Sequence, residues 1–120
     1  MRSTWVEHKG KKILYQDFSK NFYNSAVVKT ELEEVKKIVM GEPLNSVRVL
    51  SDFRDTNVGT DLLTAMNNAS AATKAHVNKT AVLGVTGMKR KLADLLTAVT
   101  GQPLKYFDNI EAAKDWLAED

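Results

Sequence analysis

The sequence of 120 residues contains no cysteine, two histidines and two prolines. Without cysteine the chain can form neither a disulfide nor a thiolate zinc site, and it has no cysteine nucleophile. His8 and His76 lie far apart in the sequence, in no spacing typical of metal ligands or of a serine–histidine relay. These absences predict a protein with no metal site, no cofactor and no enzymatic activity.

The chain also has no apolar run near the roughly 20 residues that cross a bilayer. Its first residues, Met1 to His8, lack the apolar segment of a secretory signal. The 17 basic and 15 acidic residues leave a net charge of only +2, and the basic residues form short clusters rather than one basic face. We therefore expect a cytoplasmic protein that binds no nucleic acid and makes no integral membrane contact.

What the sequence does contain is an apolar pattern whose period changes repeatedly between two and about 3.6 residues. This pattern predicts one domain over residues 1–120, with strands at 4–8, 12–18, 47–52, 80–85 and 104–107. Helices are expected around 28–39, 58–75, 88–99 and 110–117, the first capped by Asn24 or Ser25 and the last by Asp108.

The connections between these elements predict how the strands pair. Lys9-Gly10-Lys11 is typical of a tight turn, so the first two strands should form an antiparallel hairpin. Each later pair of strands is separated by a helix, which favours right-handed crossovers and parallel pairing. The predicted fold is α/β, with a single mixed sheet of five strands and four helices in the order ββαβαβαβα, the first strand antiparallel.

Four segments add a resemblance to this order of elements. They are Lys9-Gly10-Lys11-Lys12-Ile13-Leu14-Tyr15-Gln16-Asp17-Phe18-Ser19, Val47 to Asp52, Gly84-Val85-Thr86-Gly87-Met88-Lys89, and Tyr106-Phe107-Asp108 with Glu111 to Leu117. With them, the chain resembles the SpoIIAA-like family of small bacterial proteins. That family is grouped with the STAS domain and with the CRAL-TRIO lipid-binding fold.

The resemblance implies a function as well as a fold. STAS domains are switches that bind a partner protein, and phosphorylation of a Ser or Thr between the third strand and the second helix turns them off. Asp55-Thr56 aligns with the Asp-Ser pair of that region, although the segment here holds no serine between Phe53 and Leu62. We expect a non-enzymatic regulatory module whose interaction surface and switch comprise Asp52, Asp55, Thr56, Asn57 and Thr60.

Two interpretations of Asp55, Thr56, Asn57 and Thr60 stay open. A phosphate added here would lie at a helix N-terminus, where the helix dipole favours it, and would add about −1.5 to −2 charges. The alternative is that Asp55, Thr56 or Asn57 simply caps the second helix.

The junction from Gly84 to Arg90 supports a second hypothesis for function. A strand followed by a helix exposes free N–H groups, so Thr86, Gly87, Lys89 and Arg90 could bind an anion or a lipid headgroup, with an apolar pocket behind. In the plainer interpretation, Thr86 caps the helix and Gly87 permits a tight turn. The runner-up function is therefore a small-ligand binder, and homodimerisation stays open.

Two further groups of residues have alternative roles. Asp17, Asp52 and Thr86 end successive strands, where two carboxylates could hold a metal or share a proton, or simply accept hydrogen bonds from turn amides. The aromatic residues are expected in the core. Phe18, Phe22 and Tyr23 flank a loop and could instead cover an apolar pocket or a partner groove.

Overall fold

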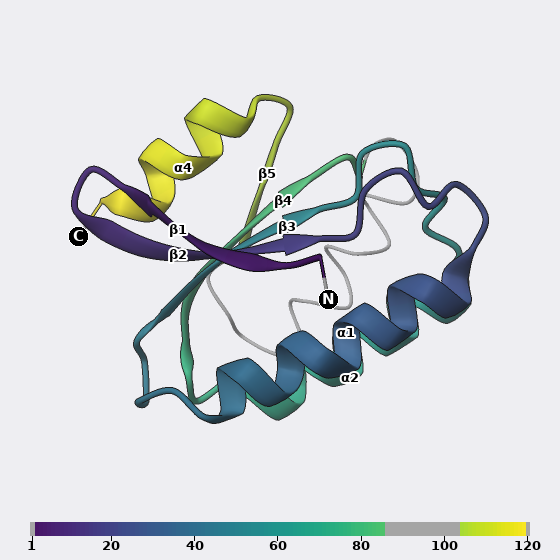
Figure 1. Cartoon of the computed structure of the whole chain (residues 1–120), viewed down its shortest axis with the longest axis horizontal. Coiled ribbons are helices and arrows are strands. Elements are labelled where there is room, and N and C mark those ends of the chain that lie inside the picture. Colours follow the sequence, from purple (N-terminus) through teal and green to yellow (C-terminus); the bar gives the residue numbers. More distant parts are fainter. Residues whose placement is uncertain (1, 86–103, 120) are drawn as a thin grey trace.

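The computed structural model describes residues 2–85 and 104–119. Its elements follow in the order β1 (Thr4–His8), β2 (Lys11–Asp17), α1 (Ser25–Met40), β3 (Val47–Asp52), α2 (Thr60–Thr73), β4 (Val77–Leu83), β5 (Leu104–Phe107) and α4 (Ile110–Ala118) (Figure 1). All five predicted strands are present. The described residues contain three helices, whereas four were predicted, and the helix expected from Gly87 onward lies outside them.

The five strands form one mixed sheet in the order β1-β2-β3-β4-β5. β1 pairs antiparallel with β2, and the other neighbours pair in parallel, as predicted. The hairpin turns at Lys9 and Gly10, whose φ angles of 51° and 79° are both positive. Two successive positive φ values give the turn a twist that matches the flanking strands, so the turn sets the register of β1 on β2.

Helices cover both faces of this sheet. α1 and α2 lie side by side along one face, and α4 lies on the other (Figure 1). Because both faces are covered, β3 in the middle is buried along nearly its whole length. Val49 faces the α1 side, while Leu50 packs with Ala113 and Leu117 of α4. Apolar side chains thus pack against helices on both faces of the sheet.

Several element ends differ from the sequence prediction. β4 begins at Val77 rather than Thr80, because Val77 pairs with Val47 and Lys79 pairs with Arg48 of β3, although Lys79 is only half-buried. β4 ends at Leu83, since Gly84 has a φ of +86° and leaves the strand. Asn24 caps α1 as predicted, but Asn109 caps α4 in place of Asp108: the Asn109 side chain accepts from the Ala112 N–H at 3.1 Å.

Among the described residues, no helix has both the length and the apolar character that crossing a bilayer requires.

Candidate functional site

The loops that follow β2 and β3 lie side by side beyond the carboxyl ends of these strands. We call residues 18–24 and 53–59 the paired loops. Backbone hydrogen bonds of 2.9–3.0 Å join Phe18 to Asp52, Lys20 to Arg54 and Phe22 to Asp55. Phe22 and Thr56 also form an isolated parallel bridge. The parallel pairing of β2 with β3 therefore continues into two segments that are not themselves strands.

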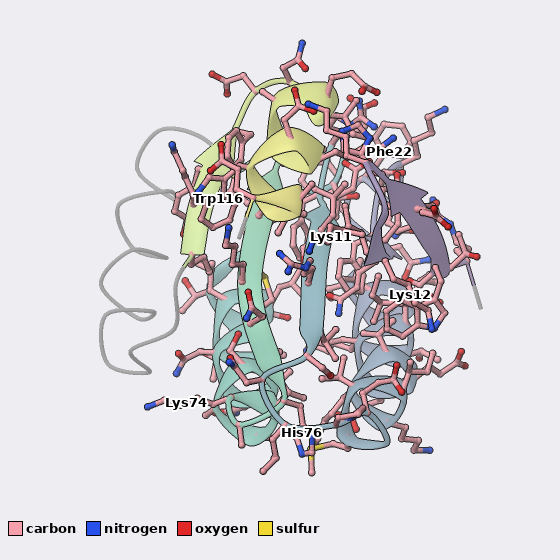
Figure 2. All side chains as sticks on the ribbon, turned by 90° about the vertical axis from the view of Figure 1, so that its left-hand side faces the viewer. Lys11, Lys12, Phe22, Lys74, His76 and Trp116 are labelled. Atoms are coloured by element: carbon pink, nitrogen blue, oxygen red, sulfur yellow. The ribbon has the colours of Figure 1, made fainter. Side chains whose placement is uncertain are left out.

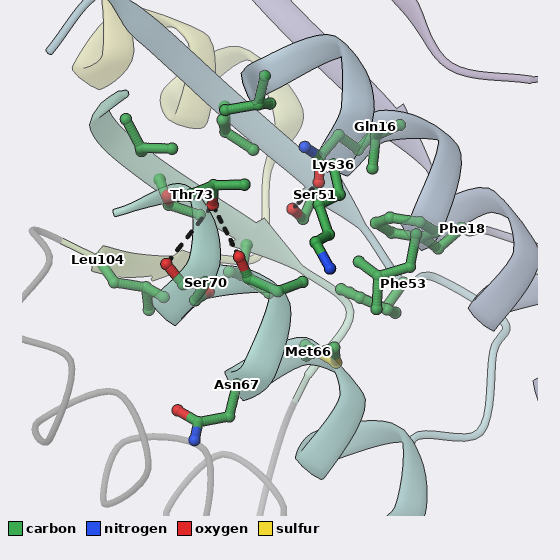
Figure 3. Close-up of a pocket in the computed structure, with 18 of the residues that line it drawn as sticks. Gln16, Phe18, Lys36, Ser51, Phe53, Met66, Asn67, Ser70, Thr73 and Leu104 are labelled. Carbon is green, nitrogen blue, oxygen red and sulfur yellow. Dashed lines mark hydrogen bonds between the residues drawn. The ribbon is translucent and has the colours of Figure 1, made fainter. Parts of the chain in front are cut away.

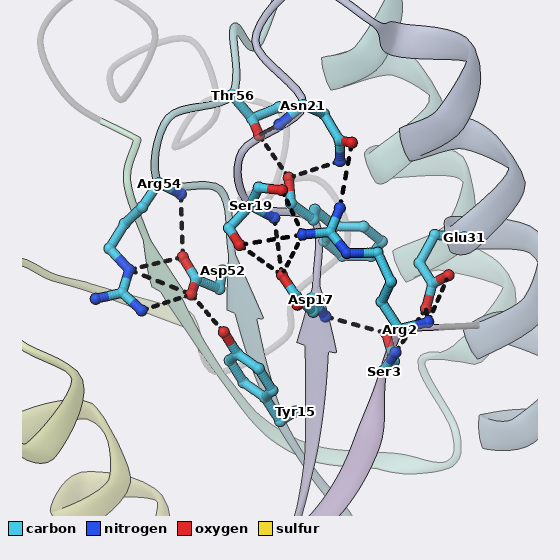
Figure 4. Close-up of polar contacts among 11 residues, drawn as sticks. Arg2, Ser3, Tyr15, Asp17, Ser19, Asn21, Glu31, Asp52, Arg54 and Thr56 are labelled. Carbon is cyan, nitrogen blue, oxygen red and sulfur yellow. Dashed lines mark hydrogen bonds and ion pairs between the residues drawn. The ribbon is translucent and has the colours of Figure 1, made fainter.

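The Thr56 side chain joins the two paired loops by hydrogen bonds. Its hydroxyl donates to the Phe18 carbonyl at 2.5 Å and accepts from the Asn21 N–H at 3.1 Å (Figure 4). α2 instead begins after Gly59, which as the capping residue provides no side-chain hydrogen bond. The predicted capping of α2 by Asp55, Thr56 or Asn57 is wrong, because Gly59 occupies the capping position and the Thr56 hydroxyl is engaged by the neighbouring loop.

Three residues of the paired loops have a left-handed backbone. The φ angles of Lys20, Phe22 and Asp55 are 57°, 50° and 58°. Non-glycine residues adopt this region at a cost, so they are found where surrounding contacts hold them. Here the backbone hydrogen bonds between the loops hold Phe22 and Asp55 in place, with Phe22 N–H donating to the Asp55 carbonyl at 2.9 Å.

The aromatic residues of the first loop divide between core and solvent. Phe18 is fully buried, stacks on Phe53 with ring centroids 4.9 Å apart and lines an apolar cavity below the loops, so it contacts a pocket as predicted but is not exposed to a partner groove. Phe22 and Tyr23 are 63% and 85% exposed. Figure 2 shows Phe22 at one end of the molecule, with Lys74 and His76 at the opposite end. The rings of Phe22 and Tyr23 are therefore exposed on a loop that backbone hydrogen bonds hold to its neighbour.

Asp52 lies beneath these loops and is completely buried. Arg54 donates to it from Nε at 3.0 Å and from Nη2 at 2.8 Å, and the Tyr15 hydroxyl donates at 2.6 Å (Figure 4). Burial by itself raises the pKa of Asp52, but the hydrogen bonds from Arg54 and Tyr15 outweigh it, so this pKa lies below its ordinary value. Burial, together with the Asp52 carboxylate, raises the pKa of Tyr15 to about 12.

Asp17 is the register partner of Asp52 on the neighbouring strand. Its Oδ1 accepts a hydrogen bond from Arg2 Nη2 at 3.2 Å. It also accepts two hydrogen bonds from Ser19, one from the backbone N–H and one from the hydroxyl (Figure 4). Each carboxylate is thus held by its own arginine and by turn amides. This arrangement favours the loop interpretation over a shared proton or a shared metal ion.

The remaining predicted site residues have clear positions. Asp55 and Asn57 are exposed on the second loop, and Thr60 is exposed as the first residue of α2. The structure therefore brings Asp55, Thr56 and Asn57 beside Phe22 and Tyr23, around a shallow hollow. Thr86, Gly87, Lys89 and Arg90, the predicted anion site, lie outside the described residues.

Sequence reasoning missed Arg54 and Tyr15 as partners of Asp52. An arginine two residues after the final aspartate of a strand was an available signal for the first. Tyr15 and Asp52 are 37 residues apart, and only the pairing of β2 with β3 brings them together. Among residues 2–85 and 104–119, no three His, Asp or Glu side chains converge in a way that could hold a metal ion.

A cavity of about 80 Å³ lies between the sheet and the two helices α1 and α2 (Figure 3). Its wall is mainly apolar, with Phe53 and Met66 among the lining residues. Within it the Ser51 hydroxyl donates to Gln16 at 3.0 Å, and Asn67 Oδ1 has no hydrogen-bond partner among the residues that the structure describes. A cavity of about 150 Å³ takes up one benzene molecule, and the volume bounded here by the described residues is roughly half of that.

The family comparison covers most of the chain. The model of the SpoIIAA-like family matches residues 13–118, a range that runs from β2 to α4 and includes both paired loops. No curated protein is significantly similar to the chain. The resemblance seen in the sequence is thereby confirmed, and the chain belongs to the SpoIIAA-like family.

Proposed function

We propose that this chain is a non-enzymatic, cytoplasmic regulatory module that binds a protein partner through the paired loops and the start of α2. One observation carries the proposal: Phe22 and Tyr23 are exposed on a loop whose backbone is held by a second loop. Aromatic residues, like Met and Arg, are enriched where proteins bind one another. Membership of the SpoIIAA-like family, which resembles the STAS switches, supports the same function.

The rigidity of the surface supports binding in a second way. Backbone hydrogen bonds, the Thr56 hydroxyl and the contacts of Asp52 with Arg54 all restrict the paired loops. A surface that is ordered before binding loses less conformational entropy when a partner docks. Exposed rings on a disordered segment would bind a partner more weakly for the same contact area, because the segment would lose more conformational entropy on binding.

The ion pairs at this end of the sheet also support a role in protein binding. The carboxylates of Asp17 and Asp52 are both engaged by arginines within the fold. Their roles in the described structure are to hold loops, and the groups exposed on the paired loops include two aromatic rings, Lys20, Asp55 and Asn57. That chemistry supports recognition rather than turnover.

The test is capture of partner proteins from a lysate of the source cell by the tagged full chain. We expect the double variant Phe22→Ser/Tyr23→Ser to lose, by about tenfold or more, proteins that the wild type enriches. Leu44→Ser is the matched control, because Leu44 is 69% exposed but precedes β3 at the opposite end of the sheet. Unchanged capture by the double variant, with an unchanged melting temperature, would overturn the proposed surface.

A further inference from the structure

We propose that the hollow beside Phe22 and Tyr23 receives a basic side chain, an arginine or a lysine, of the partner protein. This inference rests on the proposed function and specifies the chemistry of the partner at the same surface. The hollow has a volume of about 290 Å³ and is lined by Phe22, Tyr23, Asp55, Thr56 and Asn57. It lies across the paired loops, with its rings on one loop and its carboxylate on the other.

The rings supply the first attraction for a cation. Aromatic faces carry partial negative charge, and arginine or lysine groups bind over them at about 6 Å or less from the ring centre. This chain already contains such contacts: Lys12 Nζ lies 4.2 Å from the Trp5 ring centroid, and Lys79 Nζ lies 5.1 Å from that of Trp116. Phe22 and Tyr23, in contrast, keep most of their surface open to solvent.

The carboxylate of Asp55 supplies the second attraction. It is exposed and forms no hydrogen bond or ion pair within the described part of the chain. Two other surface aspartates have cationic partners: Asp61 pairs with Lys29 at 3.1 Å, and Asp115 pairs with Lys9 at 3.0 Å. Asp55 thus leaves one uncompensated negative charge beside two exposed rings.

Among residues 2–85 and 104–119, the cations near the hollow are paired with carboxylates or do not line it. Arg2 donates to Asp17 and Ser19, and Arg54 donates to Asp52. Lys20 is exposed on the first loop but does not line the hollow. Of the described residues that line the hollow, Asp55 carries the charge, and this charge complements a positive group brought by another molecule.

The backbones that carry the ring and the carboxylate are fixed relative to one another. Phe22 and Asp55 both have left-handed backbones, and a hydrogen bond of 2.9 Å joins the Phe22 N–H to the Asp55 carbonyl. A cation can therefore contact both groups without reordering the loops, which lowers the entropic cost of binding. Strained residues held by their surroundings are also frequent at binding sites.

The experiment is an NMR titration of the ¹⁵N-labelled full chain with two short peptides. The probe is acetyl-Gly-Arg-Gly-amide, and the matched control is the same peptide with citrulline, which keeps the shape of arginine but not its charge. We expect the arginine peptide to shift the amide signals of residues 22–23 and 55–57 in a saturable way. Binding of the citrulline peptide should be at least about threefold weaker.

Two variants test whether Asp55 carries the effect. Asp55→Asn should weaken binding of the arginine peptide by about threefold or more, whereas Asp108→Asn, which removes an exposed carboxylate before α4, should leave it unchanged. Equal binding of the two peptides, or wild-type binding by Asp55→Asn, would overturn the inference. Shifts confined to other regions of the chain would overturn it as well.

Capture of partner proteins from the lysate can refute the basic side chain without refuting the proposed function, and the reverse. If Phe22→Ser/Tyr23→Ser loses the wild-type partner but Asp55→Lys retains it, the interaction surface stands and the basic side chain is refuted. If the double variant retains the partner, the proposed function itself fails. Loss of the partner in both variants, together with the charge-dependent peptide titration, supports both.

Discussion

Gly84 lies directly against the backbone of Arg54. A methyl group added to Gly84 would lie 2.5 Å from the Arg54 backbone nitrogen, closer than real Cβ contacts come. Since Arg54 follows β3 and Gly84 follows β4, this contact sets how closely the second of the paired loops approaches the end of β4. Glycine is required here for its small size, and its φ of +86° is a further reason.

Gly84→Ala should therefore destabilise the protein by about 2–4 kcal/mol, combining a steric clash with backbone strain. Urea denaturation measures the change. Gly10→Ala is the matched control, because Gly10 also has a positive φ, +79°, but no atom lies within 4 Å of its added methyl group. A similar loss of stability in both variants would show that the close approach of Gly84 to Arg54 does not contribute to the destabilisation.

Asp52→Asn should destabilise the protein by about 2–3 kcal/mol, because Arg54 and Tyr15 both lose a charged acceptor. The pKa of Asp52 lies below its ordinary value of 3.8, so the ionised form is favoured by folding. Its contribution to stability is complete above that ordinary value and is lost as the pH falls through the lower folded pKa.

Denaturation of wild type and Asp52→Asn between neutral and acid pH checks this expectation. The difference in unfolding free energy should shrink as the pH falls below about 3.8. Asp61→Asn serves as the control, because Asp61 pairs with Lys29 on the open surface and such pairs contribute little. A difference independent of pH would contradict the role given to the Asp52 carboxylate.

The burial of Tyr15 beside Asp52 should be visible in the titration of its hydroxyl at high pH. Its pKa is raised from 10.0 to about 12, so folding favours the neutral phenol. The stability that this provides is complete below pH 10.0 and is lost as the pH rises toward 12. Ultraviolet absorbance should reveal a late tyrosinate step near pH 12 in the wild type that is missing from Tyr15→Phe. An unchanged titration curve in that variant would refute the assignment.

Thr56→Val should cost about 1–2 kcal/mol, since it removes a hydroxyl that bonds both Phe18 and Asn21 of the neighbouring loop. Thr56→Ser keeps the hydroxyl and should stay close to wild type. Thr64→Val is the control, because the Thr64 hydroxyl bonds only to Thr60 within α2.

Amide hydrogen exchange locates the effect of Thr56. Exchange at Asn21 and Phe22 should accelerate in Thr56→Val more than elsewhere in the chain, because these amides bond across the paired loops. If exchange accelerates uniformly instead, Thr56 acts on global stability and does not fasten the loops.

The sequence by itself determined the order of the described elements and the pairing of the strands. The hairpin at Lys9 and Gly10 and the cap at Asn24 follow from local chemistry, which the backbone expresses within a few residues. The strand from Val47 to Asp52 has the predicted bounds, because its apolar side chains must be buried on a central strand.

Only the tertiary structure decided how the candidate site is built. Phe18 and Phe22 are both aromatic residues of one short loop, yet the first is buried and the second is exposed. Thr56 looks like a helix cap in the sequence but bonds to Phe18, 38 residues away. Periodicity and capping rules describe neighbours along the chain, whereas these roles depend on which loops the parallel strands bring together in space.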